Sequence, residues 1–405
     1  MLFSISWRNV WRNKIRSAVI IAAIALGICA GVFSAAFYQG MADQRIDKVI
    51  KTELSHIQLH EPKYRQANDI SKFIPDANKI AAKIREYPEV VGVSGRITIF
   101  SLIASAETAA GVKISGITPK DERLVSNMYT KLIEGNYFEE NRRNPVIIGK
   151  KLAEKLKVRL GSKVVLTLQD IDNNITAGAF RIVGIFDTQN HIFDEANIFV
   201  LDKDLRRLMN LPKNAYHELA VLLNDNEKVP IVEERIKKEF SQLETLSWTE
   251  LSPEMSYLNE AMDLFMYIFI IIILIALLFG IINTMLMVVL ERVKEIGMLM
   301  AIGMNKLRVF TMIVLETVFL SLTGGVLGVI LGTFVSKYFE THKIDLSIWG
   351  DVYSDLGYDP FVYTNLEVSL LINVTILVIL TGILASLYPA YKALKNDPAD
   401  ALRIE

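Results

Sequence analysis

The sequence predicts an α-helical membrane protein, with four transmembrane helices and a large mixed α/β extracytoplasmic domain inserted between the first and second helices. One observation is the presence of four apolar runs of about 20 residues or more, the length that a helix needs to cross a bilayer core of about 30 Å. The other is the stretch 41–263, in which segments with strand-like and helix-like patterns follow one another, as in a mixed α/β domain. The composition agrees, because 51% of the 405 residues are hydrophobic and the mean hydropathy is +0.31.

The four predicted spans differ in length and surroundings. The second is longer than a bilayer requires, so we expect it to tilt or to project from the membrane. A cleaved signal peptide is an alternative for the first span, but its apolar run is longer than is typical of such peptides. Cys29 is the only cysteine, so no internal disulfide can form. The predicted spans are residues 17–40, 264–290, 309–335 and 367–390.

The distribution of Lys and Arg predicts which segments face the cytoplasm. Residues 1–16 carry four basic side chains and no acid, and the tail 391–405 carries three basic side chains. The short loop 291–308 also carries four, whereas the loop 336–366 has two lysines and five acids. The positive-inside rule therefore places both termini and the 291–308 loop in the cytoplasm, and the 41–263 domain and the 336–366 loop outside.

Residues 1–16 are predicted to form an interfacial helix on the cytoplasmic side. Trp7 and Trp11 are four residues apart and share one helix face, while the arginines lie on another face, where they can meet anionic headgroups. The alternative is a plain aromatic and basic flank for the first span. Both readings place this segment at the inner leaflet.

The 41–263 domain shows strands and helices in turn. Ser55–His60 alternates like a strand, and Asp76–Tyr87 has helical spacing with Asp76 as a candidate N-cap. Lys163–Leu168 and Phe180–Phe186 are predicted to form a hairpin around an Asp-Asn-Asn turn.

The domain is also predicted to contain an insertion. We expect the strand Leu219–Leu223 and the helix Ile231–Phe240 to pack with the early elements between Ser55 and Ile117. Residues of about 118–215 would then form an inserted subdomain.

The sequence offers no catalytic, cofactor-binding or metal-binding constellation. It lacks the phosphate-binding loop G-x-x-x-x-G-K-[ST] and the motifs H-E-x-x-H and G-x-S-x-G. His56 and His60 lie four residues apart on a predicted strand, which is a poor arrangement for a metal. A net charge of −1 gives no case for nucleic acid binding. We therefore expect a non-enzymatic chain.

Two features of the third span concern helix packing and buried charge. Gly324, Gly328 and Gly332 recur every four residues and predict a close approach of another helix, either within this chain or from a second one. Glu316 lies about two turns inside the span, where a carboxylate is costly unless it is paired or hydrated. We expect it to bond to a neighbour or face the headgroups; a proton relay is the alternative.

The segment 291–308 is charged and amphipathic, and it lies between two spans. It cannot cross a bilayer, so it must lie at the face where both spans emerge, and a soluble partner could push on it there. Val293, Ile296 and Met300 predict one apolar face, with Leu299 beside it. The polar edge comprises Glu291, Arg292, Lys294 and Glu295, and Gly297 and Gly303 permit a close approach or a turn. The alternative is an ordinary charged connector.

Three motifs resemble those of a known family. They are Glu291-Arg292-x-x-Glu295-Ile296-Gly297-x-Leu299-x-Ala301-Ile302-Gly303, the C-terminal Tyr388-Pro389-Ala390-x-x-Ala393 with Asp397-Pro398-x-x-Ala401-Leu402-Arg403, and the opening Trp7-Arg8-Asn9-x-Trp11-Arg12-Asn13-Lys14. Together, and in their order along the chain, these motifs resemble those of the FtsX-like permeases of ABC transporters. Among these, the chain looks most like the four-span type VII members, namely MacB-type permeases and above all the transmembrane subunits of lipoprotein-releasing systems (LolC/LolE type).

The resemblance implies partners and a mechanism. Such permeases pair with a second permease chain, identical or homologous, and bind two copies of a separate ABC ATPase, which holds ATP and Mg. The residues that would couple to the ATPase are Glu291, Arg292, Glu295, Ile296, Gly297, Leu299, Ala301 and Gly303. The complex would extract lipoproteins from the outer leaflet of a bacterial inner membrane and deliver them to a periplasmic carrier. MacB-like mechanotransmission efflux and FtsX-like regulation of a cell-wall hydrolase are the alternatives.

The resemblance also suggests where a lipid-linked substrate would lie. The first two spans bracket the external domain and could form a cavity open to membrane lipids. Soft Met and aromatic side chains near its outer end could contact acyl chains, and lipid-facing packing is the alternative. These residues are Phe37, Met41, Met262, Phe265, Met266 and Phe269. The hairpin tip Gln169–Gly178 is short and lacks an obvious hook for a carrier, which puts direct carrier capture in question.

Overall fold

The computed structural model describes residues 2–67, 69–138 and 143–395, and these form two compact units. The first comprises Met1–Asp43, Asn259–Asp345 and Phe361–Glu405, and the second comprises Gln44–Leu258 and Leu346–Pro360. We call them the helical unit and the α/β unit, and describe each by itself. The predicted C-terminal motif Asp397–Arg403 lies outside the described residues.

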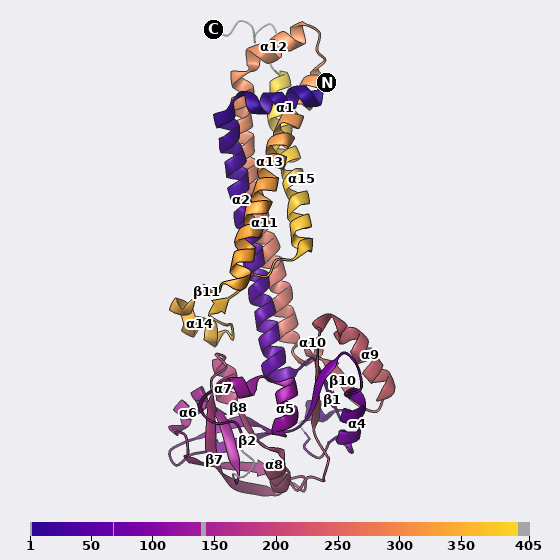
Figure 1. Ribbon diagram of the computed structural model, residues 1–405, viewed down its shortest axis with the longest axis vertical. Helices are drawn as coiled ribbons and strands as arrows, with labels where there is room; N and C mark the ends of the chain where they lie inside the picture. Colours follow the sequence, from indigo (N-terminus) through magenta and orange to yellow (C-terminus); the bar gives the residue numbers. More distant parts are fainter. Residues whose placement is uncertain (1, 68, 139–142, 396–405) are drawn as a thin grey trace. The chain divides into compact units, whose positions relative to one another are not determined.

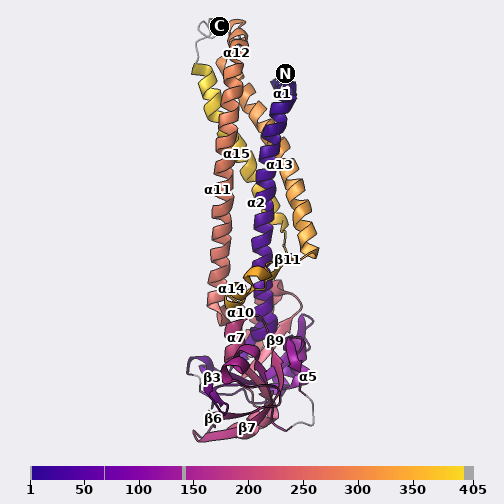
Figure 2. The same ribbon diagram turned by 90° about the vertical axis from the view of Figure 1, so that its left-hand side faces the viewer.

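Four long helices build the helical unit and run side by side in both views (Figures 1 and 2). Each contains a segment that is long and apolar enough to cross a bilayer. They extend beyond the predicted spans because polar residues continue the helical conformation at their ends. The long helices are α2 (Lys14–Val49), α11 (Pro253–Glu291), α13 (Lys306–Thr341) and α15 (Val368–Lys395).

Short elements complete the helical unit. The helices are α1 (Leu2–Arg12) and α12 (Val293–Ala301), and the strands β11 (Ile344–Asp345) and β12 (Phe361–Val362) form a small antiparallel pair. α1 packs on α13: the Ser6 hydroxyl donates a hydrogen bond to the Met312 carbonyl at 3.2 Å, and the Trp7 ring lies 5.4 Å from that of Phe319. The N-terminal segment is therefore more than an aromatic flank, because its buried face belongs to the helical core.

The glycine stripe of α13 faces α2 of the same chain. A Cβ added to Gly324 would lie 2.8 Å from the Cβ of Ile24, and one added to Gly332 would lie 2.8 Å from the Cβ of Val32. At Gly328 the nearest atom is the Ala25 carbonyl oxygen, at 2.7 Å. The absent side chains let the two backbones approach, as small residues do in membrane helices generally.

The α/β unit contains a ten-stranded sheet with the order β10-β1-β9-β2-β3-β8-β5-β7-β4, in which β6 pairs with β2 and β7. β3–β8 and β5–β7 are parallel, and the other pairs are antiparallel. The strands are β1 (Ile57–His60), β2 (Val90–Ala104), β3 (Ala109–Ile117), β4 (Leu132–Gly135), β5 (Pro145–Gly149), β6 (Lys163–Gln169), β7 (Ile175–Phe186), β8 (Asn197–Leu201), β9 (Glu218–Leu223) and β10 (Glu244–Ser247).

Short helices connect and cover the strands. The main apolar core includes Leu59, Ile97, Ile114 and Phe180, and a second, smaller apolar cluster includes Met128, Phe186 and Phe199. The helices are α3 (Tyr64–Ala67), α4 (Ala77–Ile84), α5 (Pro119–Val125), α6 (Lys150–Leu156), α7 (His191–Ala196), α8 (Asp202–Met209), α9 (Val229–Glu239), α10 (Trp248–Leu251) and α14 (Gly350–Asp355).

The sheet pairing matches part of the sequence-based expectation. β6 and β7 form the expected hairpin, with Leu168 opposite Thr176, and β9 pairs with the early strands β1 and β2. Strands of the segment 118–215 do not form a sheet of their own, because β8 continues from β3 and β6 from β2. The predicted insertion therefore shares the sheet and the main core of the unit, and it also contributes most of the second apolar cluster.

Two local predictions are confirmed, each with a difference. Asp76 is the N-cap residue of α4, but it adopts a left-handed conformation, with φ of 52°, and its carboxylate pairs with Lys79 at 3.2 Å instead of capping the helix. The strand predicted at Ser55–His60 is β1, and all four of its residues are buried, so neither of its faces is open to solvent.

The histidines of β1 and its neighbours serve the fold. The His56 ring nitrogen Nδ1 accepts a hydrogen bond from the Leu223 amide at 3.0 Å. The rings of His60 and His217 both stack on the Tyr64 ring, with centroids 5.6 and 5.1 Å from it. Burial lowers the pKa of His56 and of His217 to about 4. In the described residues, no cluster of three or more His, Cys, Asp or Glu side chains could hold a metal ion.

The glycine stripe gives a first prediction. Gly328→Ala would force a methyl group against the Ala25 backbone, so we expect the protein to lose about 1–3 kcal/mol of stability, as overpacked cores do. Thermal unfolding of the purified protein in detergent measures this. Gly280→Ala is the matched control, because a Cβ there would meet nothing within 4 Å. Equal unfolding temperatures for the two variants would contradict the packing.

The buried histidines give a second prediction. Because the folded-state pKa of His56 lies below the usual 6.5, folding favours the neutral ring. Its contribution to stability is complete above pH 6.5 and is lost as the pH falls towards 4. Burial raises the pKa of Asp194 to about 6, which acts in the opposite direction, so comparing variants isolates the histidine.

His56→Asn keeps an acceptor for the Leu223 amide and removes the titration. We expect the unfolding temperature of this variant to fall less between pH 6.5 and 4 than that of the wild-type protein. His342→Asn, which alters an exposed histidine at the end of α13, serves as the control. An identical pH profile for His56→Asn and wild type would refute the assignment.

Candidate functional site

The segment between α11 and α13 contains one short helix, α12, with a break in the helical backbone on each side. α11 ends at Glu291, and Arg292 (φ −103°, ψ 13°) leaves the helical conformation before α12 begins at Val293. After α12, Gly303 has a φ of +103°, which favours glycine, and Asn305 accepts a hydrogen bond from the Leu307 amide to cap α13. The predicted segment 291–308 is thus one short helix held between two defined breaks.

α12 has one face against the rest of the helical unit. Ile296 and Gly297 are buried, and Val293, Leu299 and Met300 are half-buried. The apolar face predicted from the sequence therefore packs inward, against the apolar core of the unit that also contains Val309 and Ile313. These inward-facing side chains are not available to another protein, so a partner would have to contact the opposite face of α12.

The opposite face of α12 is exposed and partly apolar. Met298 is 53% exposed and Ile302 is 79% exposed, and Ala301 and Lys294 lie exposed beside them. Leu307, at the start of α13, is 68% exposed. We call Lys294, Met298, Ala301 and Ile302 the outer face of α12.

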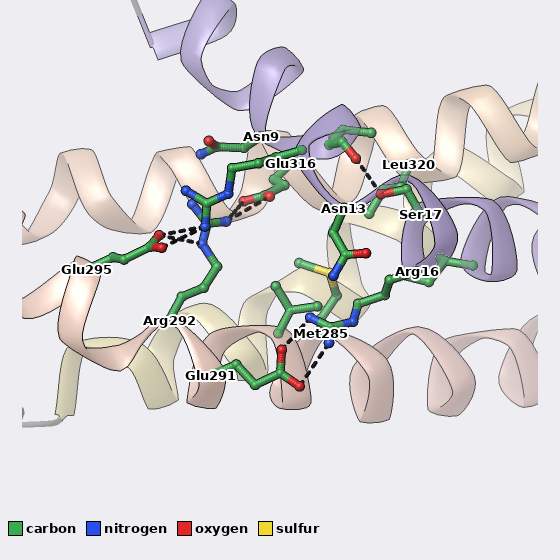
Figure 3. A pocket seen from close by; sticks show the side chains of 14 residues that line it. Asn9, Asn13, Arg16, Ser17, Met285, Glu291, Arg292, Glu295, Glu316 and Leu320 are labelled. Atoms are coloured by element: carbon green, nitrogen blue, oxygen red, sulfur yellow. Dashed lines mark hydrogen bonds and ion pairs between the residues drawn. The ribbon is translucent and has the colours of Figure 1, made fainter. Parts of the chain in front are cut away.

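The acidic residues of the predicted coupling motif are engaged within the chain (Figure 3). Glu295 accepts two hydrogen bonds from one Arg12 nitrogen at 2.7 and 2.8 Å, and Glu291 pairs with Arg16 at 2.6 Å. Hydrogen bonds from Arg12 lower the pKa of Glu295 below its usual value. These two carboxylates therefore join α12 and the end of α11 to the N-terminal segment.

Arg292 links Glu295 to Glu316, which lies in α13. Its Nε lies 3.0 Å from Glu295, and its Nη1 lies 3.0 and 3.3 Å from the two carboxylate oxygens of Glu316 (Figure 3). The Glu316 residue is only 5% exposed, so a charged partner is what its burial requires. This pairing accounts for the carboxylate inside the predicted span without a proton relay.

A cavity of about 330 Å³ lies among these side chains. Asn9 and Asn13 line it from the N-terminal segment, and Met285 and Leu320 give it an apolar part (Figure 3). The complete lining is Asn9, Val10, Arg12, Asn13, Arg16, Ser17, Ile20, Met285, Val288, Glu291, Arg292, Glu295, Glu316 and Leu320. The site balances three arginines with three glutamates.

The predicted substrate-cavity residues lie on α2 and α11. Phe265 and Phe269 are exposed on α11, and Phe37 is half-buried with its ring 6.5 Å from that of Phe33. Met41, Met262 and Met266 are half-buried. The two helices meet where Gly27 faces Leu277, since a Cβ on Gly27 would lie 2.9 Å from that side chain.

The sequence did not reveal Arg12 and Arg16 as part of this site. They were assigned to lipid headgroups because their segment is aromatic and basic. A signal was present, since Arg12 and Arg16 are four residues apart and so are Glu291 and Glu295. Matching spacings of opposite charge are too common to identify a pair on their own.

Comparisons with known proteins agree with the observed architecture. A model of the FtsX-like permease C-terminal region matches residues 267–398, and a model of the MacB-like periplasmic core domain matches residues 17–239, more than half of the chain. The lipoprotein-releasing system transmembrane protein LolC of Neisseria meningitidis is 27% identical, over 75% of this chain and 76% of that protein. LolC of Buchnera aphidicola is 25% identical, over 72% of both chains.

An archaeal relative shows a similar level of identity. An uncharacterized ABC transporter permease of Methanocaldococcus jannaschii is 27% identical over 67% of this chain. The match spans 65% of that protein, just under two thirds of its length. Similarity to ABC transporter permeases thus extends over most of this sequence.

The buried ion pair gives a third prediction. Arg292→Gln would leave Glu316 buried without its charged partner, so we expect a loss of about 3–5 kcal/mol. The double variant Arg292→Gln/Glu316→Gln removes both charges and should recover much of that loss. Thermal unfolding in detergent measures both, with Arg308→Gln as an exposed control. A double variant no more stable than Arg292→Gln would contradict the pairing.

Proposed function

This chain belongs to the FtsX-like permeases of ABC transporters with a MacB-like core domain, and from that premise we propose that it couples a separate ATPase to lipoprotein release. The sequence carries no phosphate-binding loop, so ATP and Mg would be held by two copies of the ATPase. A second permease chain, identical or homologous, would complete the complex. The chain itself would have no catalytic residue.

The observation that carries the proposal is the outer face of α12. Met298 and Ile302 are apolar, exposed and one helical turn apart, and Lys294 adds a charge at the rim. Exposed apolar side chains with a polar rim are typical of protein interfaces. A nine-residue helix of this kind between two spans fits a groove on a soluble partner, and we assign that partner as the ATPase.

The proposed coupling residues then divide into two groups. Ala301, with Met298 and Ile302, would touch the ATPase, and Leu299 lies at the edge of this surface. Ile296 and Gly297 would instead hold α12 against the bundle. Arg292, with the carboxylates Glu291 and Glu295, would fix the helix in place through ion pairs, and Gly303 would end it.

The proposed substrate is a lipoprotein of the outer leaflet. Support comes from the relatives named as lipoprotein-releasing proteins and from the exposed aromatic side chains Phe265 and Phe269 of α11, which could contact acyl chains. The lipoprotein would pass to a periplasmic carrier. We propose no hook for that carrier, because the turn between β6 and β7 is short and Asp170 closes it locally on Asn174.

The proposed location is a bacterial inner membrane, with both termini in the cytoplasm and the α/β unit in the periplasm. The Lys and Arg distribution supports this orientation. MacB-like mechanotransmission is the second candidate function, favoured by the match of residues 17–239 to the MacB-like core domain. In that case the complex would bind a periplasmic adaptor and would not release acylated protein.

The docking face gives a fourth prediction. Met298→Asp/Ile302→Asp should weaken binding of the partner ABC ATPase by at least about tenfold, because charges replace the central apolar contacts. Co-purification from membranes measures binding. Ile192→Asp, at an exposed apolar position of the α/β unit, is the matched control.

The same preparation tests the substrate. Acylated lipoproteins that co-purify with the wild-type complex and leave on addition of ATP, identified by mass spectrometry, are the expected result. An adaptor in their place would favour mechanotransmission. Full ATPase binding by the doubly substituted protein would contradict the assignment of α12.

A further inference from the structure

We propose that α1 and α12 move as one unit, and that Arg12 is the positioning residue that joins them. The proposal rests on the proposed function only for the source of the force, which is an ATPase that displaces α12. It assigns to the N-terminal helix a part in transmission. The sequence had indicated only an interfacial helix.

The two exposed ion pairs join different kinds of helices. Arg12 is the last residue of α1, and its partner Glu295 lies in α12, so this pair connects the two short helices. Arg16 lies in α2, and its partner Glu291 is the last residue of α11, so this pair connects the two long helices.

Each pair lies across a break in the chain. Asn13 separates α1 from α2, and Arg292 separates α11 from α12. A rotation of α12 about Arg292 would therefore pull on α1 through Arg12. The second pair, between Arg16 and Glu291, would keep Asn13 and Arg292 close to each other, because it joins the two long helices beside these breaks.

α1 passes the displacement on because its other face is packed. Ser6 and Val10 are buried, Ser6 donates to the Met312 carbonyl, and the rings of Phe3 and Trp7 lie 5.7 and 5.4 Å from Phe319. These contacts attach α1 to α13 at two positions that lie about two turns apart on that helix. Arg292, the residue before α12, also binds α13 directly through Glu316.

The ion pairs and packing contacts thus form a closed loop of three helices. α12 contacts α1 through Glu295 and Arg12, α1 contacts α13 through Met312 and Phe319, and Arg292 holds Glu316 of α13 at the start of α12. A closed loop transmits a displacement to every member, whereas a free connector would transmit it only along the backbone. Arg12 is the member most open to solvent, with 54% of its side chain exposed, so it can be changed without opening the core.

The structural test measures the distance between α1 and α12 in the full-length protein. Spin labels on Ser4→Cys and Lys294→Cys, both exposed positions, are introduced with Cys29→Ala, and the distance distribution is recorded in lipid nanodiscs. We expect one narrow distribution for the otherwise unchanged chain. Arg12→Glu places two carboxylates together and should broaden it, while Arg12→Lys should largely restore it.

The matched control is Arg8→Glu, which makes the same charge change on the same helix at an exposed residue for which no ion pair is seen in the described part of the chain. If Arg12→Glu gives the same distribution as Arg8→Glu and the unchanged chain, packing on α13 alone holds α1. That result would overturn the proposal.

The functional test uses the unlabelled protein with the ABC ATPase that co-purifies with it. Arg12→Glu should leave ATPase binding within about twofold of wild type, because the outer face of α12 is intact, and should lower the permease-dependent change in ATP hydrolysis by about fivefold, the equilibrium factor of one exposed ion pair. If Arg12→Glu broadens the distance distribution between α1 and α12 but leaves the permease-dependent ATP hydrolysis unchanged, the proposal is also overturned. Failure of the wild-type chain to bind any ATPase would reject the proposed function, and the spectroscopic test would still decide whether the link exists.

Discussion

The pairing of Arg292 with Glu316 is the interaction on which the arrangement of the helical unit depends. Arg292 is the single residue between α11 and α12, and it neutralises a carboxylate that α13 buries. A buried charge without a partner is strongly destabilising, so α12 cannot leave this position freely. The break between the two helices is consequently held by charge as well as by backbone conformation.

Arg292 also connects the buried pair to the ion pairs around it. Arg292 also bonds Glu295, which binds Arg12, so one carboxylate of α12 is shared between the core and the N-terminal helix. Apolar side chains on the inner face of α12 add packing, and the outer face is left for a partner. In the proposed function, this division lets the ATPase move α12 as a rigid piece.

The sequence predicted what depends on local pattern. The apolar runs identified α2, α11, α13 and α15, and an Asp-Asn-Asn turn identified the β6–β7 hairpin, because length and turn chemistry act over a few residues. It missed the partners of Glu291 and Glu295, which lie 275 and 283 residues away. It placed the start of α4 at Asp76 and a strand at Ser55–His60, but it did not reveal the left-handed backbone of Asp76 or the burial of both faces of β1.

The central claim is that α12 is the contact through which an ATPase acts on this permease. It is tested most directly by placing a photo-crosslinking amino acid at Ile302 in living cells and identifying the crosslinked protein by mass spectrometry. An ABC ATPase at Ile302, and none at the buried Ile296, is the result we predict. Crosslinks from Ile302 only to lipid, or to a protein that is not an ATPase, would contradict the account.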